Sequence, residues 1–325
     1  MPCQEHEALG ALGSELPARD TSELADTTDT ANPRWTLRLP GGRRLDLGAR
    51  PLVAAVVNLT PDSFSDGGRW RDPEHAVEGA LAMLAEGADL VDLGAESTRP
   101  GGGVYGTGAR EVGTGEELDR LLPVLEPLRA ATAAPISVDT RKGSVARSAL
   151  EAGADLINDV SALADPELAA AVADAGCPVV LMHSRGEIAS MQSGIRFADV
   201  VAEVRTELAQ ALERAAAAGI DRAQTLLDPG IGFGKTYGQN LLLLRRLEAL
   251  GDLGRPLVVG ASRKAFIGDL TGEPPAERLA GSLAAAAWAA AGGAAVVRVH
   301  HAGESARFLR VWTAVRDAAT AEAAA

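Results

Sequence analysis

The chain has 325 residues and a formal net charge of −13; 46% of its residues are hydrophobic and 23% are charged. This balance is typical of a globular protein with a large buried core. Because the chain is acidic and has no run of lysines or arginines, it lacks the basic surface with which proteins bind nucleic acids and anionic membranes. The sequence begins with no basic and then apolar stretch, and no apolar run is long enough to span a membrane, so a cytoplasmic location is expected.

The first 33 residues differ in composition from the rest of the chain. They hold seven acidic residues against one arginine, and they show no hydrophobic periodicity. Such a segment cannot bury enough apolar surface to offset the entropy of ordering it, so a disordered acidic extension is predicted over residues 1–33. The folded domain is expected over residues 34–322. It should begin with a β-hairpin, because apolar residues alternate from Trp35 to Leu39, a Pro-Gly-Gly turn follows, and a second run returns to Leu47.

Eight short apolar runs follow, and most are separated by segments of helical period. The runs are residues 51–58, 88–95, 135–140, 155–160, 177–183, 225–230, 256–262 and 294–300. Runs of this length, bounded by turn signals and without polar alternation, are typical of parallel strands buried on both faces. Intervening segments such as 73–87 and 198–219 end at a glycine, as helices often do. The count predicts a (β/α)8 TIM barrel. The alternative is a doubly wound open sheet, which normally has fewer strands and needs a switch point that the sequence does not reveal.

Polar side chains stand at the end of each predicted strand, where a (β/α)8 barrel carries its active site. In chain order they are Asn58, Glu96, Thr98, Arg99, Asp139, Asn158, His183, Asp228, Ser262, Lys264, Arg298 and His300. Any one of them could cap a helix or close a turn. Burying all of them without a ligand or water would cost several kcal/mol, so together they predict a polar binding site at one end of the barrel.

Two rare residue types give further information. Only three of the 31 basic residues are lysines, namely Lys142, Lys235 and Lys264, and each follows a predicted strand. These positions could require a compact ammonium group instead of a guanidinium fork, although Lys142 and Lys235 could equally be solvated by chance. The two cysteines, Cys3 and Cys177, have neither metal-ligand nor disulfide-rich spacing, and Cys177 is expected in the core.

The stretch DPGIGFGKT, residues 228–236, looks like a phosphate-binding loop but does not fit the Walker A pattern G-x-x-x-x-G-K-[ST]. That pattern would place its first glycine at Pro229, and Tyr237 and Gly238 separate the threonine from the next apolar helix. We therefore predict that the stretch ends the sixth strand with Asp228. A second glycine pattern, at Gly101, Gly103 and Gly106, lies well past its strand and is interpreted as part of a long loop.

The motifs together resemble those of the dihydropteroate synthase family. They are NLTPDSFSDGG (58–68), ESTRPG (96–101), SVDT (137–140), IND (157–159), LDPGIGFGK (227–235), SRK (262–264) and RVH (298–300), in the order and spacing of that family. The resemblance extends over about residues 50–312 and implies a (β/α)8 barrel. It also implies an enzyme of folate biosynthesis that joins 6-hydroxymethyl-7,8-dihydropterin diphosphate to 4-aminobenzoate, releases diphosphate, and is a target of sulfonamides.

The resemblance further implies roles for individual residues. A carboxylate can accept both hydrogens on the donor edge of the pterin ring, and the expected pterin-binding residues are Asp139, Asn158, Asp228 and Lys264. The diphosphate is expected at Asn58, Arg99, Arg298 and His300, with Mg²⁺ bound near Asn58. The residues expected around 4-aminobenzoate are Thr98, Arg99, Pro100, Phe233 and Ser262. Catalysis is assigned to Asp139, Lys264, Arg298 and His300, which would stabilise a pterin methylene cation and the departing diphosphate.

The resemblance also implies that two loops close over the site and that the chain forms a homodimer. The loops are residues 59–69, with Gly67 and Gly68 as hinge positions, and the segment after the second strand. Dimerisation is expected through the late helices, where residues 284–291 are rich in small side chains, although the same run could be intrachain core. Small-molecule substrates are the only other partners expected.

Three features of the sequence depart from the family pattern. Gly94-Ala95 replaces two glycines, the segment 101–115 is longer than usual, and His301 stands where the family has an aspartate. The last change removes a carboxylate beside the expected diphosphate site, so one alternative is a paralogue that binds pterin without turning it over. Another alternative is a pterin-dependent methyltransferase on the same barrel, although no corrinoid-binding domain follows.

Overall fold

The structure is a computed structural model that describes residues 34–60, 72–96, 112–186 and 194–322. The extension predicted over residues 1–33 lies outside them, so its disorder and the domain boundary stay predictions. Within the described residues, no helix is both long and apolar enough to cross a membrane.

The predicted hairpin is present at the start of the fold. Strand β1 (Trp35–Arg38) pairs antiparallel with β2 (Arg44–Leu47), and Trp35 lies opposite Leu47. A short 3-10 helix over Pro40–Gly42 joins the two strands. Gly41 has a φ of 73° there, a left-handed conformation that residues with a Cβ rarely adopt.

Eight parallel strands form a closed barrel, as predicted. They are β3 (Leu52–Asn58), β4 (Leu90–Gly94), β5 (Ile136–Asp139), β6 (Leu156–Asp159), β7 (Val179–Met182), β8 (Thr225–Asp228), β9 (Leu257–Val259) and β10 (Ala294–Val299). Neighbours in the barrel follow chain order, and β10 pairs with β3, where Val297 lies opposite Val53. This last pairing closes the sheet and excludes the open, doubly wound alternative.

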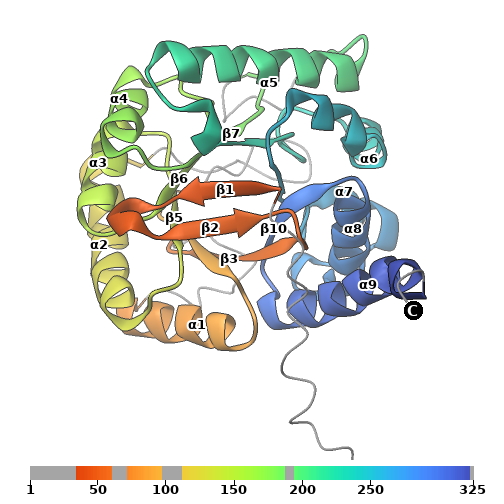
Figure 1. Ribbon diagram of the computed structural model, residues 1–325, viewed down its shortest axis with the longest axis horizontal. Helices are drawn as coiled ribbons and strands as arrows, with labels where there is room; N and C mark the ends of the chain where they lie inside the picture. The colour runs from red at the N-terminus through yellow and green to blue at the C-terminus, as the bar shows by residue number, and fades with distance from the viewer. Residues whose placement is uncertain (1–33, 61–71, 97–111, 187–193, 323–325) are drawn as a thin grey trace, which may run out of the picture. The chain divides into compact units, whose positions relative to one another are not determined.

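Helices surround the barrel in a ring (Figure 1). They are α1 (Pro73–Ala85), α2 (Thr114–Ala131), α3 (Gly143–Glu151), α4 (Pro166–Ala175), α5 (Val200–Ala217), α6 (Tyr237–Arg245), α7 (Ala265–Thr271), α8 (Leu279–Ala291) and α9 (Ala302–Glu322). Several begin at a side-chain cap: Asp72, Asp165 and Asp199 each accept a backbone N–H of the first turn. Helix α4 ends at Gly176 in the left-handed conformation, as the glycine pattern indicated.

The apolar core has two parts, and their positions distinguish the two ends of the barrel. One part lies between the strands and the helices and contains Cys177, which is 1% exposed and whose pKa is raised by burial to about 12. In the other part, leucines of the hairpin pack on side chains near the N-terminal ends of the strands, including Leu52, Leu90 and Leu156. The hairpin therefore covers the N-terminal end (Figure 1), and the polar strand ends lie at the opposite end.

Candidate active site

Three of the polar strand ends stand in one row with Gly94 across β3, β4, β5 and β6. The sheet register places Asn58 opposite Gly94, Gly94 opposite Asp139, and Asp139 opposite Asn158. Gly94 leaves room between its neighbours: a Cβ at this position would lie 3.8 Å from both the Asn58 Oδ1 and the Asp139 Cβ. The predicted pterin and diphosphate residues of the first half of the barrel are thus brought together.

Arg298, from β10, reaches two carboxylates at the centre of this end of the barrel. Its Nη2 donates to Asp139 Oδ2 at 2.7 Å, and its Nε donates to Asp92 Oδ2. Burial lowers the pKa of Arg298, but Asp92 and Asp139 raise it by more than burial lowers it. The guanidinium therefore stays charged. Asp92 was not among the site residues predicted from the sequence. The available signal was an acid in the middle of the apolar run of β4, where a carboxylate, here 2% exposed, needs a cationic partner.

Three buried oxygens in this cluster lack a hydrogen-bond partner among the described residues. They are Asp92 Oδ1, Asp139 Oδ1 and Asn158 Oδ1. Leaving a buried acceptor unsatisfied costs about 1–3 kcal/mol. Burial also raises the pKa of Asp139 to about 7; Arg298 opposes this shift, while Asp92 and Glu117 add to it. The cluster is therefore suited to a ligand that brings hydrogen-bond donors or positive charge.

Asp228 ends β8 and begins the stretch DPGIGFGKT, residues 228–236. The Gly230 N–H donates to Asp228 Oδ1 at 2.7 Å, which orients the carboxylate. Gly230 has a φ of 67°, and a Cβ here would lie 1.8 Å from the His183 carbonyl oxygen, so the turn requires glycine. Burial raises the pKa of Asp228, and the Gly230 N–H, Lys264 and Arg298 lower it.

The remaining predicted residues come from the turn after β8 and the ends of β9 and β10. Lys264 Nζ lies 4.1 Å from the centroid of the Phe233 ring, a cation–π distance. The His300 ring contacts the Ser262 hydroxyl, with 3.1 Å between Nδ1 and Oγ. The pKa of His300 lies well below its usual range because of burial and the nearby cations Arg263, Arg298 and Lys264, so the ring is neutral at neutral pH.

His301, which is expected to stand where the family has an aspartate, contacts Arg263. The Arg263 Nη2 lies 2.7 Å from His301 Nε2. Arg263 itself has a φ of 58° and is fixed at its backbone by Ser282 and Arg278. The imidazole therefore keeps an acceptor for the arginine but removes one negative charge from this place.

Lys235 is buried, which excludes a solvated position. It is 2% exposed, and its Nζ lies 2.9 Å from each of three acceptors: Gly230 O, Phe233 O and His183 Nδ1. Since an ammonium only donates, His183 Nδ1 accepts, and its Nε2 carries the proton that it donates to Glu207 at 3.0 Å. Burial lowers the pKa of Lys235 to about 7, and Asp228 and Glu207 oppose that shift.

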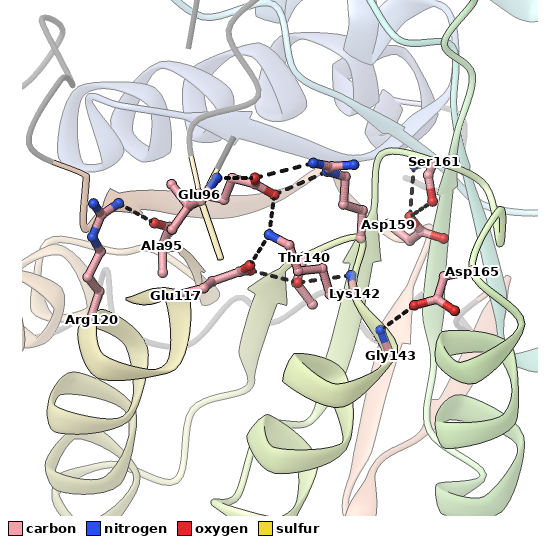
Figure 2. A network of polar contacts seen from close by, with 12 residues as sticks. Ala95, Glu96, Glu117, Arg120, Thr140, Lys142, Gly143, Asp159, Ser161 and Asp165 are labelled. Carbon is pink, nitrogen blue, oxygen red and sulfur yellow. Dashed lines mark hydrogen bonds and ion pairs between the residues drawn. The ribbon is translucent and has the colours of Figure 1, made fainter. Parts of the chain in front are cut away.

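Lys142 is likewise paired instead of solvated (Figure 2). Its Nζ lies 2.8 Å from Glu96 Oε2 and 2.6 Å from Glu117 Oε2. The Glu117 side chain is 1% exposed and that of Glu96 is 4% exposed. Glu117 was not singled out in the sequence, because a glutamate on a helix of mixed polarity gives no sign that it is buried.

Glu96 and Glu117 also hold neighbouring backbone and side chains. Glu96 accepts from Arg141 and from the backbone N–H of Val112, where the described chain resumes after residue 96. Glu117 accepts from the hydroxyl of Thr140 at 2.7 Å, directly after the strand end that carries Asp139 (Figure 2). The network thus connects α2 to the ends of β4 and β5.

Several predicted residues lie outside the described part of the chain. They are Thr98, Arg99 and Pro100, the glycine pattern at 101–106, the hinge positions Gly67 and Gly68, and most of the two predicted closing loops. Among the residues that are described, no group of three or more His, Cys, Asp or Glu side chains could hold a metal ion. Any metal at Asn58 would have to take most of its ligands from substrate and water.

The comparison with protein families gives a match to the pterin binding enzymes over residues 54–300. The dihydropteroate synthase of Synechocystis is 42% identical over 289 residues, covering 88% of this chain and 98% of the relative. That of Escherichia coli is 43% identical, covering 85% of this chain and 95% of the relative. The chain belongs to the dihydropteroate synthase family. Members of the family are transferases, so the predicted class of enzyme is confirmed.

Solved structures of the family agree in fold along the described barrel. Dihydropteroate synthase of Yersinia pestis, in complex with a sulfonamide drug, has a TM-score of 0.81 and 42% identity, covering 86% of this chain and 98% of that one. The enzyme of Xanthomonas albilineans in complex with 7,8-dihydropteroate has a TM-score of 0.75 and 45% identity, with the same coverages of 86% and 98%. Dihydropteroate synthase is therefore the function that the sequence and the fold both support.

Proposed function

We propose that the chain condenses 6-hydroxymethyl-7,8-dihydropterin diphosphate with 4-aminobenzoate at the polar end of its barrel, through a pterin cation. The observation that carries this proposal is the pair of carboxylates on Arg298, those of Asp92 and Asp139, with Asn158 opposite Asp139 in the sheet. Each of these three acidic or amide side chains has a buried oxygen that lacks a partner among the described residues. A ring rich in N–H donors would satisfy those acceptors. In the free protein these unsatisfied acceptors lower the stability of the fold, and a bound pterin would remove that loss.

The pterin amide N–H and 2-amino group would donate to the Asp228 carboxylate. One Asp228 oxygen already accepts from Gly230, which fixes the direction in which the other can accept. Asn158 Oδ1 would accept from a further ring nitrogen, and Lys264 would donate to the ring from the side of Phe233. These contacts would set the methylene carbon of the substrate beside Asp139.

The reaction would begin when the bond between the methylene carbon and the diphosphate oxygen breaks and the electron pair leaves with the diphosphate. Asp139 in its ionised form, which Arg298 and the developing positive charge favour, would stabilise the cation in a site of low dielectric. The amine nitrogen of 4-aminobenzoate then forms the new C–N bond and gives up one proton, which the released diphosphate would accept.

The leaving diphosphate would be bound by cations and by a neutral imidazole. Arg298 remains charged, and the His300 N–H and Nδ1 both contact the Ser262 hydroxyl. If this hydroxyl accepts from the backbone and donates to Nδ1, then Nε2 carries the proton and can donate to a diphosphate oxygen. His300 would therefore act as a neutral donor.

Mg²⁺ is included in the proposal with Asn58 as its protein ligand. The ion prefers oxygen ligands and commonly keeps waters and substrate phosphate oxygens, so one amide oxygen at a strand end fits its needs. When bound, it would neutralise charge on the diphosphate. Ser262 and Phe233 would contact 4-aminobenzoate, together with Thr98, Arg99 and Pro100, whose roles stay predictions.

A homodimer through the late helices is also part of the proposal. Large apolar side chains are exposed on three neighbouring helices: Leu270 on α7, Trp288 on α8, and Val311 and Val315 on α9. Exposed apolar groups that gather on adjacent elements are typical of an interface. The small residues at 284–291 are mostly buried within the chain, so the larger side chains carry this argument. The cytoplasmic location stays a prediction.

The purified protein, given the pterin diphosphate, 4-aminobenzoate and Mg²⁺, should form 7,8-dihydropteroate and diphosphate, and a sulfonamide should compete with 4-aminobenzoate. Asp139→Asn should remain folded and lose at least about 100-fold in kcat. No product from a folded protein would refute the proposal and leave the pterin-binding paralogue, whereas methyl transfer from methyltetrahydrofolate would indicate the methyltransferase alternative.

A further inference from the structure

Lys235 is a charged residue of the stretch 228–236 to which the proposed chemistry gives no part. It lies behind the turn, 2% exposed, and contacts no predicted substrate group. Its Nζ makes its shortest contacts with two carbonyl oxygens of the turn, those of Gly230 and Phe233, and with the ring of His183. All three ammonium hydrogens therefore have acceptors within the protein.

The two carbonyls belong to the residues that shape the ligand side of the turn. Gly230 also donates its N–H to Asp228 Oδ1, so this glycine stands between the lysine and the carboxylate. Phe233 presents its ring to Lys264 on the other face. Holding both carbonyls from behind fixes the path of the turn and, with it, the direction of the Gly230 N–H.

His183 connects the lysine to the rest of the barrel. Its backbone N–H donates to the Asp228 carbonyl, and its ring accepts from Lys235. On the other side, Nε2 contacts Glu207 of α5, which lies with His183 in the wall of a cavity of about 450 Å³. A continuous row of contacts thus runs from α5 through the end of β7 to the turn after β8.

The acceptors of the row favour an ammonium at its centre. Two carbonyl oxygens and one ring nitrogen all accept, and a neutral amine has only two hydrogens to donate. Arginine would not replace the lysine, because a planar fork with five donors cannot be satisfied in a space filled by three acceptors. This accounts for a lysine here in a chain that otherwise uses arginine.

We propose that Lys235 is a positioning residue for pterin recognition, which acts through Gly230 on the Asp228 carboxylate and is held in place by His183 and Glu207. The inference rests on the proposed role of Asp228. It predicts that removing the ammonium weakens pterin binding far more than it changes the binding of 4-aminobenzoate.

The test compares Lys235→Met, Asp228→Asn, the double variant and the control Thr236→Ala. Thr236 is the adjacent residue and caps α6, so its loss lowers stability without touching the lysine. Pterin affinity is measured with 6-hydroxymethylpterin by calorimetry, and KM and kcat are measured for both substrates. Melting curves show which variants are folded.

Lys235→Met should raise the pterin Kd about tenfold relative to Thr236→Ala, with the KM for 4-aminobenzoate changed less than about threefold. The double variant should bind pterin no more weakly than Asp228→Asn, since the lysine acts through that carboxylate. A pterin Kd within about twofold of the control, or fully additive effects, would overturn the proposal.

Two other results of this test would also be informative. If Asp228→Asn alone leaves pterin affinity unchanged, the role of Asp228 fails; a weakened Lys235→Met would then show that the lysine does not act through it, which also overturns the inference. If Lys235→Met does not fold, Glu207→Ala takes its place, because Glu207 is partly exposed and the variant keeps the lysine. Its pterin Kd should rise about threefold, and no change would refute the row of contacts.

Discussion

Replacing Lys142 with methionine should destabilise the fold by about 3 kcal/mol. The lysine is the only cation that the structure shows on the Glu117 carboxylate within the described residues, and it also contacts Glu96 (Figure 2). Methionine keeps most of the length of the side chain but removes the charge. The two carboxylates, both almost fully buried, would then face each other without the group that lies between them.

The magnitude follows from what each carboxylate keeps. Removing one partner of a buried ion pair costs about 3–5 kcal/mol, because a charge is left in a medium of low dielectric. Glu96 keeps Arg141 and the Val112 N–H, so most of the cost arises at Glu117, which keeps only the hydroxyl of Thr140. Because only one carboxylate loses its main partner, the expected loss of stability lies near the lower end of this range.

Urea unfolding followed by circular dichroism measures this loss. The matched control is Lys142→Met combined with Glu117→Gln, in which no unpaired charge remains at the helix and most of the stability should return. A loss below about 1 kcal/mol in the single variant, or a double variant as unstable as the single one, would refute the assignment of an electrostatic role to Lys142.

Three further predictions concern the site and the assembly. Burial raises the pKa of Asp139 from 3.8 to about 7, so this group's contribution to stability should fall as the pH rises through that interval; kcat/KM, which needs the ionised carboxylate, should rise instead and level off above about pH 7. A pH-independent kcat/KM below about pH 7 would contradict this. His301→Asp should change kcat by less than about threefold, because Arg263 already has an acceptor there, whereas a gain of about 100-fold would show that the natural chain is an impaired paralogue. Trp288→Asp should convert a dimer to a monomer in sedimentation analysis, and a sedimentation coefficient equal to that of the unchanged protein would exclude this face as the interface.

The fold was predictable because its signals are local. Each strand is a short apolar run bounded by turns, and the same end of each run carries a polar residue, so the closed barrel and the row from Asn58 to Asn158 follow from position alone. In a parallel barrel every strand ends on the same side, and sequence order becomes spatial order. The resemblance to the family then supplied roles, which chain geometry could not have supplied.

The pairing of charges could not be predicted in the same way. Arg298 contacts Asp92, which is more than 200 residues away, and Glu117 lies in a helix whose pattern does not distinguish a buried glutamate from a solvated one. Such contacts depend on how side chains meet after the barrel closes. Lys235 shows the same limit: the sequence located it in a turn, but only the three-dimensional path of the chain brings His183 to its ammonium group.

The three lysines differ in how well arginine could replace them. Lys142 lies between two glutamates, Lys235 lies among two carbonyls and a ring nitrogen, and Lys264 lies over the Phe233 ring. At Lys235 a compact ammonium can turn its donors toward three separate acceptors, which a planar guanidinium cannot do, whereas a guanidinium pairs well with carboxylates and stacks on aromatic rings. Lys142 joins two carboxylates, Lys235 binds backbone carbonyls of the turn after β8, and Lys264 faces the proposed substrate. Exchange for arginine should therefore lower stability most at Lys235, even though arginine replaces lysine almost everywhere else in this chain.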